Sequence, residues 1–539
     1  MKNLLLSFLL MFLPILVNAD PIEIDGILYN LISKGNIAEV TKGNIYSGEV
    51  VIPDKISFDN IEYTVSVIGN YAFSESINLT SITIPASVKS IGTGAFQLTG
   101  SWGYLTSVHI SDIGAWCDIK FADYDSNPLH RAQHLYLNDE EIGDLIIPNG
   151  VKSIGDYAFS GYKNLKSVTF PNSVTSIGSY AFNNCLGLSS VIISDLESWC
   201  KISFGNGYSN PLNNAHHLYL NGEEVKDVVL PDKVTSICNY AFQSCSSISS
   251  VIIPNSVTSI GNCAFENCTS IVSISIGNGV TSIGNSAFYN CIGLTSITIP
   301  NSVMSLGISA FKNCSNLTFV LIPNSVTSIS DYAFQNCSSL SSITIPQNVL
   351  SIGNYAFRGC EKITDVYCMN EQVRGNLKSG KGLYSNPNAF IDSYQEYITL
   401  HVPATSVEAY KALEPWKNFK DVVALNSEEI PEIPKCATPT ISIVDGKITF
   451  NCETEGVEYI SEVTVSDAKK YYDNEISAPK KFKVSVYAVK ANHENSETTT
   501  AEFDFLSFIA MPGDVNGDGD VNVADHVKLT EIIMNKTDD

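Results

Sequence analysis

Residues Thr281–Val303, TSIGNSAFYNCIGLTSITIPNSV, form one unit of a pattern that recurs along most of this 539-residue chain. In LTSITIP, Ile297 and Ile299 alternate with polar residues, which predicts a short half-buried strand that ends at Pro300. SIG predicts a second extended piece, and SAFYNC predicts a single helical or 3-10 turn that points its alanine, phenylalanine and cysteine inward. No single unit can bury so many apolar side chains, so we expect neighbouring units to stack.

The Ala-Phe pair of this unit appears in ten aligned copies, which begin at residues 66, 89, 152, 175, 235, 258, 281, 304, 327 and 350. The step is constant at 23 residues from residue 235 onward, and a fixed period of this size is typical of a solenoid. Equivalent strands of stacked coils lie about 4.8 Å apart in a parallel sheet, so roughly 15 coils form a rod or arc about 70 Å long.

Seven cysteines occupy the same slot of the repeat, three residues after the phenylalanine: Cys185, Cys245, Cys268, Cys291, Cys314, Cys337 and Cys360. Seven thiols cannot all pair, and in-register stacking makes their side chains run parallel, which is poor geometry for disulfides. A one-dimensional row also does not converge on a tetrahedral zinc ion. We therefore expect a buried ladder of cysteines that pack as small hydrophobic residues.

Two longer copies, which begin at Ser111 and Ser194, match each other at an offset of 83 residues and interrupt the series. In each, a segment such as HLYLNGEEV predicts a strand followed by a tight turn, so we expect coils that carry an ordered excursion. Their histidines and glutamates raise the question of a metal or acid-base site: His130, His134, His216, His217, Glu140, Glu141, Glu223 and Glu224. His130 matches an asparagine in the second copy, and paired glutamates at a turn are ordinarily solvated, so neither chemistry is expected.

Residues from about 22 to 425 resemble the BspA-type leucine-rich repeat proteins, both in TSIGNSAFYNCIGLTSITIPNSV and in YITLHVPATSVEAYKALEPWKNF at the end of the array. The resemblance implies a mostly β fold, a leucine-rich repeat solenoid with a parallel sheet. It also implies a surface or secreted protein, since several family members are adhesins for host matrix proteins. The resemblance does not specify the ligand, because the residues that repeat are those that pack in the core.

The N-terminal segment MKNLLLSFLLMFLPILVNAD has a lysine, an apolar run and a small residue, Ala19, before Asp20. This pattern predicts a secretory signal over residues 1–19 that is cleaved after Ala19, since the apolar run is too short for a membrane span. No later segment is apolar enough to cross a membrane, so we expect a secreted, extracellular or cell-surface protein. A formal net charge of -24 argues against nucleic acid as a partner.

The array is expected to comprise an N-terminal cap at 20–65 and repeats at 66–425. Residues 426–435, NSEEIPEIPK, are acidic and proline-spaced, which is typical of a linker. Alternating segments such as KKFKVSVYAVKA predict a small antiparallel β-sandwich over 436–508, similar to Ig-like and fibronectin-type modules. Cys436 and Cys452 are its only cysteines; in an exported module we expect a disulfide between them, and two buried thiols are the alternative.

The last segment, residues 512–539, contains the sequence GDVNGDGDVNVADHVKLTEIIMNKTDD. It places oxygen-bearing side chains at the alternating positions of a calcium loop, with Gly519 at the sharp turn: Asp514, Asn516, Asp518, Asp520 and Asp525. Aspartate at the last position resembles the dockerin repeat, in which one helix follows the loop, here at about 523–534. Calcium is the expected cofactor. Dockerins have two such loops and this chain has one, so docking to a cohesin-like partner and a calcium-stabilised terminal cap both remain open.

The strand residues that face away from the expected core are polar or mixed. Stacking aligns them on one broad and weakly charged face, which suits an extended protein or polysaccharide ligand. This candidate face comprises Thr83, His109, Thr169, Ser275, Thr298 and Thr344, together with Ile192, Ile252 and Leu321. The alternative is that these residues are only the solvated side of the sheet.

An adhesin-like binding protein without enzymatic activity is the leading hypothesis. The second is a non-catalytic component of an extracellular polysaccharide-degrading assembly, tethered through the dockerin-like segment. A hydrolase needs two carboxylates, or a nucleophile with its base, at one cleft, and no position of the array breaks the packing pattern in that way. We therefore expect no catalytic residues.

Overall fold

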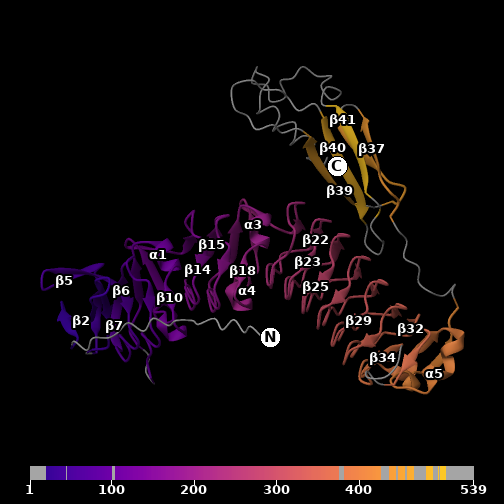
Figure 1. The fold of residues 1–539 in the computed structure, drawn as a ribbon, viewed down its shortest axis with the longest axis horizontal. Coiled ribbons are helices and arrows are strands. Elements are labelled where there is room, and N and C mark those ends of the chain that lie inside the picture. Colours follow the sequence, from indigo (N-terminus) through magenta and orange to yellow (C-terminus); the bar gives the residue numbers. More distant parts are fainter. Residues whose placement is uncertain are drawn as a thin grey trace, which may run out of the picture.

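The computed structural model describes residues 20–43, 45–99, 103–375, 382–426, 436–444, 447–455, 458–466, 481–489, 496 and 498–504. The array is a parallel β-solenoid of about 16 turns, close to the number expected from the repeat. Figure 1 shows it as a curved rod in which successive coils lie side by side. The prediction of a mostly β solenoid is therefore confirmed.

A mixed sheet covers the N-terminal end of the array. Its strands are β1 (Ile22–Ile24), β2 (Ile27–Ile32), β3 (Ile37–Val40), β5 (Lys55–Phe58) and β6 (Ile61–Ile68). β1, β2 and β3 form an antiparallel meander, β5 pairs antiparallel with β6, and β3 pairs in parallel with β6. β6 then pairs in parallel with the first short strand of the repeat, so the cap continues directly into the array.

Each coil contributes a longer strand to a parallel ladder along one side of the array. In chain order these strands are β4 (Ser47–Val51), β7 (Asn78–Ile84), β9 (Ser107–Ile110), β11 (His134–Leu137), β13 (Asp144–Ile146), β15 (Ser167–Phe170), β17 (Ser190–Ile193), β19 (Leu218–Leu220), β21 (Asp227–Val229), β22 (Ser250–Ile253), β24 (Ser273–Ile276), β26 (Ser296–Thr298), β28 (Phe319–Leu321), β30 (Ser342–Ile345), β32 (Asp365–Cys368), β35 (Thr399–Val402) and β36 (Asp421–Ala424). The register is regular, as in Ser250 opposite Ser273. Buried and half-buried residues alternate along strands such as β15, as the period-two pattern predicted.

The SIG segments form a second ladder of shorter strands. These are β8 (Ser90–Ile91), β10 (Lys120–Phe121), β14 (Ser153–Ile154), β16 (Ser176–Ile177), β18 (Ser203–Phe204), β23 (Ser259–Ile260), β25 (Ser282–Ile283), β27 (Ser305–Leu306), β29 (Ser328–Ile329), β31 (Ser351–Ile352), β33 (Val373–Arg374) and β34 (Leu383–Ser385). They pair in parallel with their neighbours, again in register, as in Ile260 opposite Ile283. Their apolar residue points into the core, so two ladders of strands enclose it.

The two longer copies insert short helices and a reversed strand. The first adds α1 (Ile113–Cys117), η1 (Tyr124–Ser126), α2 (Leu129–Ala132) and β12 (Glu140–Glu141), and the second adds α3 (Leu196–Cys200), η2 (Gly207–Ser209), α4 (Leu212–Ala215) and β20 (Glu223–Glu224). The chain reverses through Asn138-Asp139 and Asn221-Gly222, all with positive φ, into antiparallel pairs. The expected strand and tight turn are confirmed. Because β12 and β20 are antiparallel, each ends one parallel sheet, and β13 and β21 begin the next.

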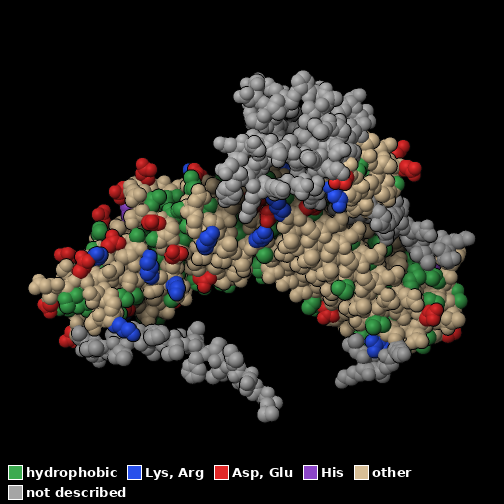
Figure 2. Space-filling model, turned by 45° about the horizontal axis from the view of Figure 1, so that its top comes forward, with side chains coloured by type: hydrophobic (Ala, Val, Ile, Leu, Met, Phe, Trp, Pro, Cys, Tyr) green, Lys and Arg blue, Asp and Glu red, His purple; other side chains and the backbone are tan. Residues whose placement is uncertain are grey.

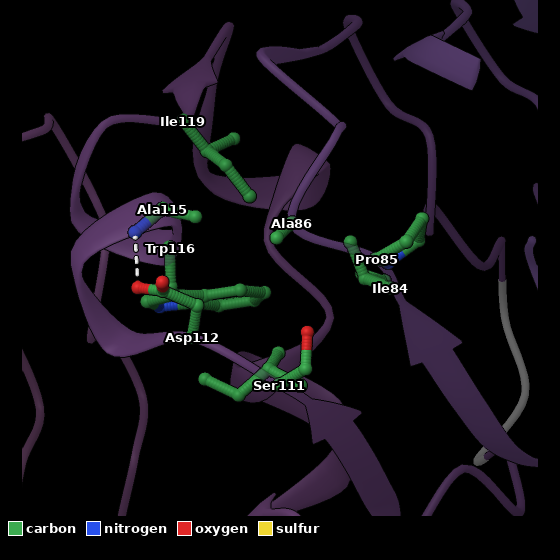
Figure 3. Close-up of a pocket in the computed structure, with 9 residues that line it drawn as sticks. Ile84, Pro85, Ala86, Ser111, Asp112, Ala115, Trp116 and Ile119 are labelled. Atoms are coloured by element: carbon green, nitrogen blue, oxygen red, sulfur yellow. Dashed lines mark hydrogen bonds between the residues drawn. The ribbon is translucent and has the colours of Figure 1, made fainter. Parts of the chain in front are cut away.

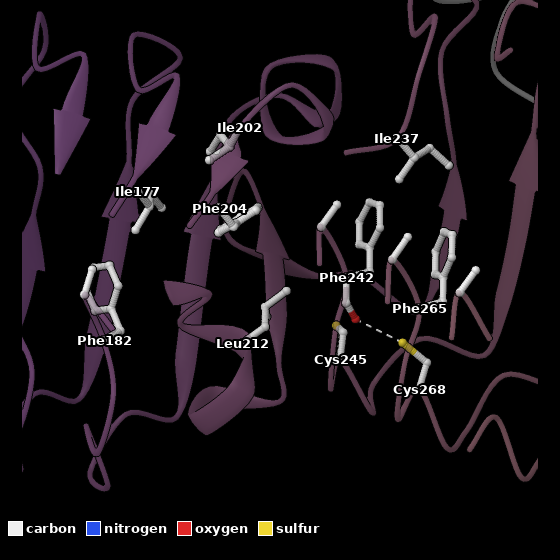
Figure 4. Close-up of a cluster of buried hydrophobic side chains, with 14 of the residues drawn as sticks. Ile177, Phe182, Ile202, Phe204, Leu212, Ile237, Phe242, Cys245, Phe265 and Cys268 are labelled. Atoms are coloured by element: carbon white, nitrogen blue, oxygen red, sulfur yellow. Dashed lines mark hydrogen bonds between the residues drawn. The ribbon is translucent and has the colours of Figure 1, made fainter. Parts of the chain in front are cut away.

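The inward side chains form columns that run along the array. The phenylalanines of six successive coils stack with ring centroids 5.1 to 5.5 Å apart and rings within 10° of parallel: Phe242, Phe265, Phe288, Phe311, Phe334 and Phe357. Figure 4 shows two of these rings beside Cys245 and Cys268. All seven cysteines of the slot are fully buried thiols without disulfides. The buried cysteine ladder predicted from the repeat is therefore confirmed.

The segment SAFYNC does not form the helical or 3-10 turn that we expected. Its alanine, phenylalanine and cysteine do point inward and are fully buried. However, Ser286 and Asn290 have φ values of 54° and 59°, which no right-handed helix allows. The backbone N–H groups alternate instead: Phe288 donates to Ala310 in the next coil at 2.9 Å, while Tyr289 donates to Ser286 at 3.1 Å. Bonds between coils, which a single unit cannot form, therefore replace the helix.

Aromatic residues close the C-terminal end of the array. The elements here are η3 (Gln395–Tyr397), η4 (Ala404–Ser406), α5 (Val407–Lys411) and η5 (Trp416–Asn418), beside β35 and β36. Tyr410 and Trp416 are fully buried, and Trp416 packs against Phe390 and Phe419 with centroids 5.7 and 5.6 Å away. The hydroxyl of Tyr410 donates to the carbonyl of Asn370 at 3.0 Å, so this cap is both packed and hydrogen-bonded.

The segment after the linker contains two antiparallel sheets. They comprise β37 (Thr440–Val444) with β38 (Lys447–Asn451), and β39 (Glu458–Ser466), β40 (Lys481–Val489) and β41 (Thr499–Asp504) in that order. The expected antiparallel pairing is present. The expected disulfide is not formed: the thiol of Cys452 donates to the carbonyl of Ala437 at 3.0 Å, and Cys436 is buried without a bridge to it. Two thiols are therefore present, as in the alternative, but only Cys436 is buried and Cys452 is half-buried.

Candidate functional site

One residue of each long strand points away from the core and is aligned by register with its counterpart on the paired strand of the same sheet. We call the set of these residues the outward column. The register of the strands places Thr83 opposite His109, Ser275 opposite Ile252, and Thr344 opposite Tyr367. The described members are Val51, Thr83, His109, Tyr136, Ile146, Thr169, Ile192, Tyr219, Val229, Ile252, Ser275, Thr298, Leu321, Thr344, Tyr367, His401 and Val423. All residues of the predicted ligand face therefore lie in one column.

Two pairs of stacked rings lie in the outward column. His109 stacks on Tyr136 with centroids 4.7 Å apart and rings 8° from parallel, and Tyr367 stacks on His401 at 4.6 Å and 21°. Of these four residues, only His109 was predicted from the sequence to lie on the ligand face. The signal for the others was present, because each occupies the third place of its strand, in HLYL, DVYC and TLHV, as His109 does in SVHI. Their stacking was not predictable without the register of the coils.

Carboxylates hold three of the histidines of the N-terminal half. Nδ1 of His109 lies 3.4 Å from Oδ1 of Asp139, and Nδ1 of His134 lies 2.7 Å from Oε1 of Glu141. The second excursion repeats the latter pair, with His217 2.6 Å from Glu224. The hydrogen bond from His134 lowers the pKa of Glu141. These partly exposed histidine–carboxylate contacts lie in or beside the outward column and contribute little to stability.

His130 and His216 serve the structure of the excursions. His130 is largely buried, its Nδ1 lies 2.5 Å from the carbonyl oxygen of Asn127, and burial lowers its pKa. Nδ1 of His216 lies 3.0 Å from the carbonyl oxygen of Ser244. Among the described residues, no three side chains of histidine, cysteine, aspartate or glutamate converge as metal ligands.

A small hollow lies where α1 meets the preceding coil (Figure 3). Ile84, Pro85, Trp116 and Ile119 contribute apolar walls. Its one carboxylate belongs to Asp112, and Figure 3 shows that this group accepts the backbone N–H of Ala115, at 2.9 Å. Asp112 is thus the N-cap of α1, and its carboxylate serves the structure of the helix.

Figure 2 shows acidic and basic side chains scattered singly among uncharged ones on the face in view. The outward column also contains exposed apolar residues: Val51, Ile146 and Val229 are 64%, 67% and 52% exposed. Each belongs to the first strand of a long-strand sheet, where no preceding strand covers it. These exposed aliphatic side chains add apolar contact area to a weakly charged face.

Several predicted features lie outside the described residues. They are the signal segment 1–19, residues 427–435 of the linker, the helix expected at about 523–534 and the calcium ligands Asp514, Asn516, Asp518, Asp520 and Asp525. None of the helices in the described part of the chain combines the length and the apolar character needed to span a bilayer.

Comparison with solved structures returns bacterial leucine-rich repeat proteins. A leucine rich cell surface protein from Faecalibacterium prausnitzii is 25% identical, with a TM-score of 0.38 over 60% of this chain and 94% of that one. A leucine-rich repeat protein from Bacteroides ovatus is 24% identical, with a TM-score of 0.43 over 75% and 99%. The leucine rich repeat protein of T. pallidum is 26% identical, with a TM-score of 0.30 over 38% and 87%. No curated protein matches the chain.

The family assignment rests on the repeats themselves. The model of the BspA type leucine rich repeat region matches in six copies, over residues 54–117, 132–211, 215–337 and 281–375. These ranges include all ten Ala-Phe units and cover more than half of the chain. The chain belongs to the BspA-type leucine-rich repeat family.

Proposed function

We propose that this chain is a non-catalytic, adhesin-like protein of the cell surface or the extracellular space, and that its outward column binds an extended protein or polysaccharide. The observation that carries the proposal is the column itself. It runs along about 16 turns, its side chains are not used by the core, and it contains the stacked pair of His109 and Tyr136.

The composition of the column supports binding rather than simple solvation. Aromatic side chains supply large contact area at low entropic cost, and they are enriched where binding energy is concentrated. His109 and Tyr136 are half-buried, and the exposed Ile146 begins the next sheet beyond them. An extended ligand that follows the column meets polar, aromatic and aliphatic groups in turn.

The test is retention of the purified full chain on immobilised matrix proteins and insoluble polysaccharides. The informative variant is His109→Ala/Tyr136→Ala, which removes the ring pair. Met304→Ala is the matched control, because Met304 is 60% exposed and lies outside the outward column. We expect saturable retention on at least one surface that the double variant weakens about tenfold or more and the control leaves unchanged. Equal retention of all three proteins would exclude the outward column as the binding face.

The proposed extracellular location is supported by the N-terminal segment, in which an apolar run precedes Ala19. Fractionation of cells that express the full gene, followed by N-terminal sequencing of the exported protein, tests it. We expect a mature chain that begins at Asp20.

We further propose that the C-terminal loop binds calcium through Asp514, Asn516, Asp518, Asp520 and Asp525. Its support is the spacing of oxygen ligands around Gly519. A single loop of this kind is suited either to stabilising the end of the chain or to docking on a cohesin-like partner in an extracellular assembly. A pull-down with cohesin modules in calcium and in chelator separates the two roles.

A further inference from the structure

One position of the repeat has a left-handed backbone in all ten copies. It is the residue before the alanine of Ala-Phe, and φ lies between 52° and 65° for Tyr71, Gly94, Tyr157, Tyr180, Tyr240, Cys263, Ser286, Ser309, Tyr332 and Tyr355. Six of these ten residues are tyrosines. Left-handed backbone is unfavourable for large side chains, and glycine or asparagine is the usual choice there. The sequence therefore places bulky rings where they are conformationally costly.

The stacking of the phenylalanine column does not require these rings. Ser286 and Ser309 occupy the same position in coils that stack equally well, with the neighbouring phenylalanines 5.3 Å apart. Two of the tyrosines are exposed, Tyr71 at 42% and Tyr180 at 36%, whereas Tyr157 and Tyr240 are partly buried against the core. Strained residues that the fold itself does not need are candidates for a functional role.

Among the left-handed tyrosines, those of the first and the last copies have a lysine or arginine side chain of the same chain over the ring. Nζ of Lys42 lies 6.0 Å from the centroid of Tyr71, and Nζ of Lys312 lies 5.3 Å from that of Tyr332. Cζ of Arg358 lies 5.3 Å from the centroid of Tyr355. These distances are typical of cation-π contacts. The left-handed tyrosines thus already bind lysine and arginine side chains within the molecule.

The middle of the series is a stack of three rings with no such cation. Tyr157 stacks on Tyr180 at 5.4 Å and 7°, and Tyr180 stacks on Tyr208 of η2 at 5.6 Å and 12°. Within the described residues no lysine or arginine lies over these three rings, and Tyr208 is 52% exposed. We call Tyr157, Tyr180 and Tyr208 the tyrosine stack.

Acidic groups accompany the tyrosine stack. Asp156 precedes Tyr157 in the chain, is exposed, and accepts the backbone N–H of Ser179 at 2.6 Å. Burial first, and then the neighbouring ionisable groups Tyr180, Asp156 and Asp123, raise the pKa of Tyr157. The whole chain carries a formal net charge of -24. Both the local and the long-range field therefore attract cations to this site.

We propose that the tyrosine stack docks a basic polypeptide segment of a partner protein, which places a lysine or arginine side chain over the rings as Lys312 and Arg358 do elsewhere in the series. Arginine suits the site because its planar guanidinium stacks on rings and its N–H groups reach the carboxylate of Asp156. An anionic partner is repelled by the same carboxylates. This surface is distinct from the outward column, so it adds a second binding site to the proposed function.

The test measures binding of the full chain to immobilised oligoarginine, with oligoglutamate and a neutral soluble oligosaccharide as comparison probes. The variant is Tyr157→Ser/Tyr180→Ser/Tyr208→Ser, which introduces the residue found at Ser286 and Ser309 and leaves the net charge unchanged. We expect affinity for oligoarginine to fall at least about tenfold, since the ring faces that would carry the cation are lost. Tyr355→Ser is the matched control; its ring is already covered by Arg358, so it should change affinity less than about twofold.

A second triple variant, Tyr157→Phe/Tyr180→Phe/Tyr208→Phe, keeps the rings and removes the hydroxyls. Retained affinity supports docking on the ring faces, whereas lost affinity overturns it in favour of hydrogen bonding to the phenols. Unchanged binding of the triple serine variant would overturn the proposal, because attraction by net charge alone would then explain the affinity. Loss of oligosaccharide binding instead of oligoarginine binding would also overturn it and identify a carbohydrate partner.

Discussion

The thiol of Cys291 donates a hydrogen bond to the carbonyl oxygen of Phe265 in the preceding coil, with Sγ 3.2 Å from the oxygen. The same bond recurs along the ladder, from Cys185, Cys268, Cys314, Cys337 and Cys360 to Phe159, Phe242, Phe288, Phe311 and Phe334. Six of the seven ladder cysteines therefore fill a small apolar space and also satisfy a carbonyl between two coils, while Cys245 is hydrogen-bonded to the hydroxyl of Ser247. This double role explains why the slot holds a small residue with a donor.

Serine should replace Cys291 better than alanine does. Cys291→Ser keeps a donor to Phe265 and should lower the free energy of unfolding by about 1 kcal/mol or less, whereas Cys291→Ala loses both the donor and the sulfur and should lower it by about 1–2 kcal/mol. Ser76, which is buried in the same slot of the first copy, shows that serine fits. Urea unfolding followed by circular dichroism measures both changes. A serine variant less stable than the alanine variant would contradict the assigned bond.

Alkaline pH should destabilise the array through its buried thiols. Burial raises the pKa of Cys314 and of Cys360 from 9.0 to about 12. Because the folded pKa lies above the unfolded one, the stabilising contribution is complete below pH 9 and is lost as pH rises from 9 toward 12. The urea concentration at the midpoint of unfolding should therefore be lower above pH 9 than below it. The midpoint of Cys314→Ser, which lacks one ionisable thiol, should fall less steeply; an equal slope would show that other groups dominate.

A ladder of side-chain amides should tolerate aspartate but not alanine. Oδ1 of Asn262 accepts the backbone N–H of Asn285 at 2.7 Å, and Asp331 accepts the N–H of Asn354 at 2.6 Å in the same place of a later coil. Asn262→Ala removes the acceptor and should lower the unfolding free energy by about 0.5–1 kcal/mol. Asn262→Asp preserves it and serves as the control. Thermal unfolding of both variants checks the prediction, which requires the aspartate variant to be the more stable.

Truncating the phenylalanine column should be the most damaging single change. Phe288 is fully buried between Phe265 and Phe311, with ring centroids 5.5 and 5.3 Å away. Phe288→Ala leaves a cavity that the neighbouring coils cannot fill, and should lower the free energy of unfolding by about 3–5 kcal/mol. Ser286→Ala, two residues away and outside the column, is the control. A loss of less than 1 kcal/mol for Phe288→Ala would show that the coils collapse around the gap.

Calcium removal should affect only the C-terminal segment. We expect calorimetry of the full chain to detect one calcium site that chelator abolishes and Asp514→Ala eliminates, because position 1 of the loop supplies a carboxylate ligand. Asp538→Asn, outside the predicted loop, should bind as the unchanged chain does. The unfolding midpoint of the array, monitored by its β-sheet signal, should not change. Calcium binding that survives Asp514→Ala would place the site elsewhere.

The sequence by itself determined the solenoid, the residues that line its core and the tight turns of the excursions. These features follow from patterns within a single unit: alternation in LTSITIP, burial of Ala287, Phe288 and Cys291, and Asn221-Gly222 at a reversal. Periodic repetition then requires every unit to do the same. The outward position of the predicted ligand-face residues followed from the same alternation.

The tertiary structure decided the features that depend on which residue of one coil lies beside which residue of the next. Only stacking gives Phe288 an acceptor at Ala310, and this bond produces left-handed turns where a helix was expected. Only stacking brings Tyr208, from a coil of different length, onto Tyr180, and Tyr136 onto His109. Local propensity acts within a few residues, whereas these contacts join residues 22 to 28 positions apart, so they are determined by the register of the assembled array.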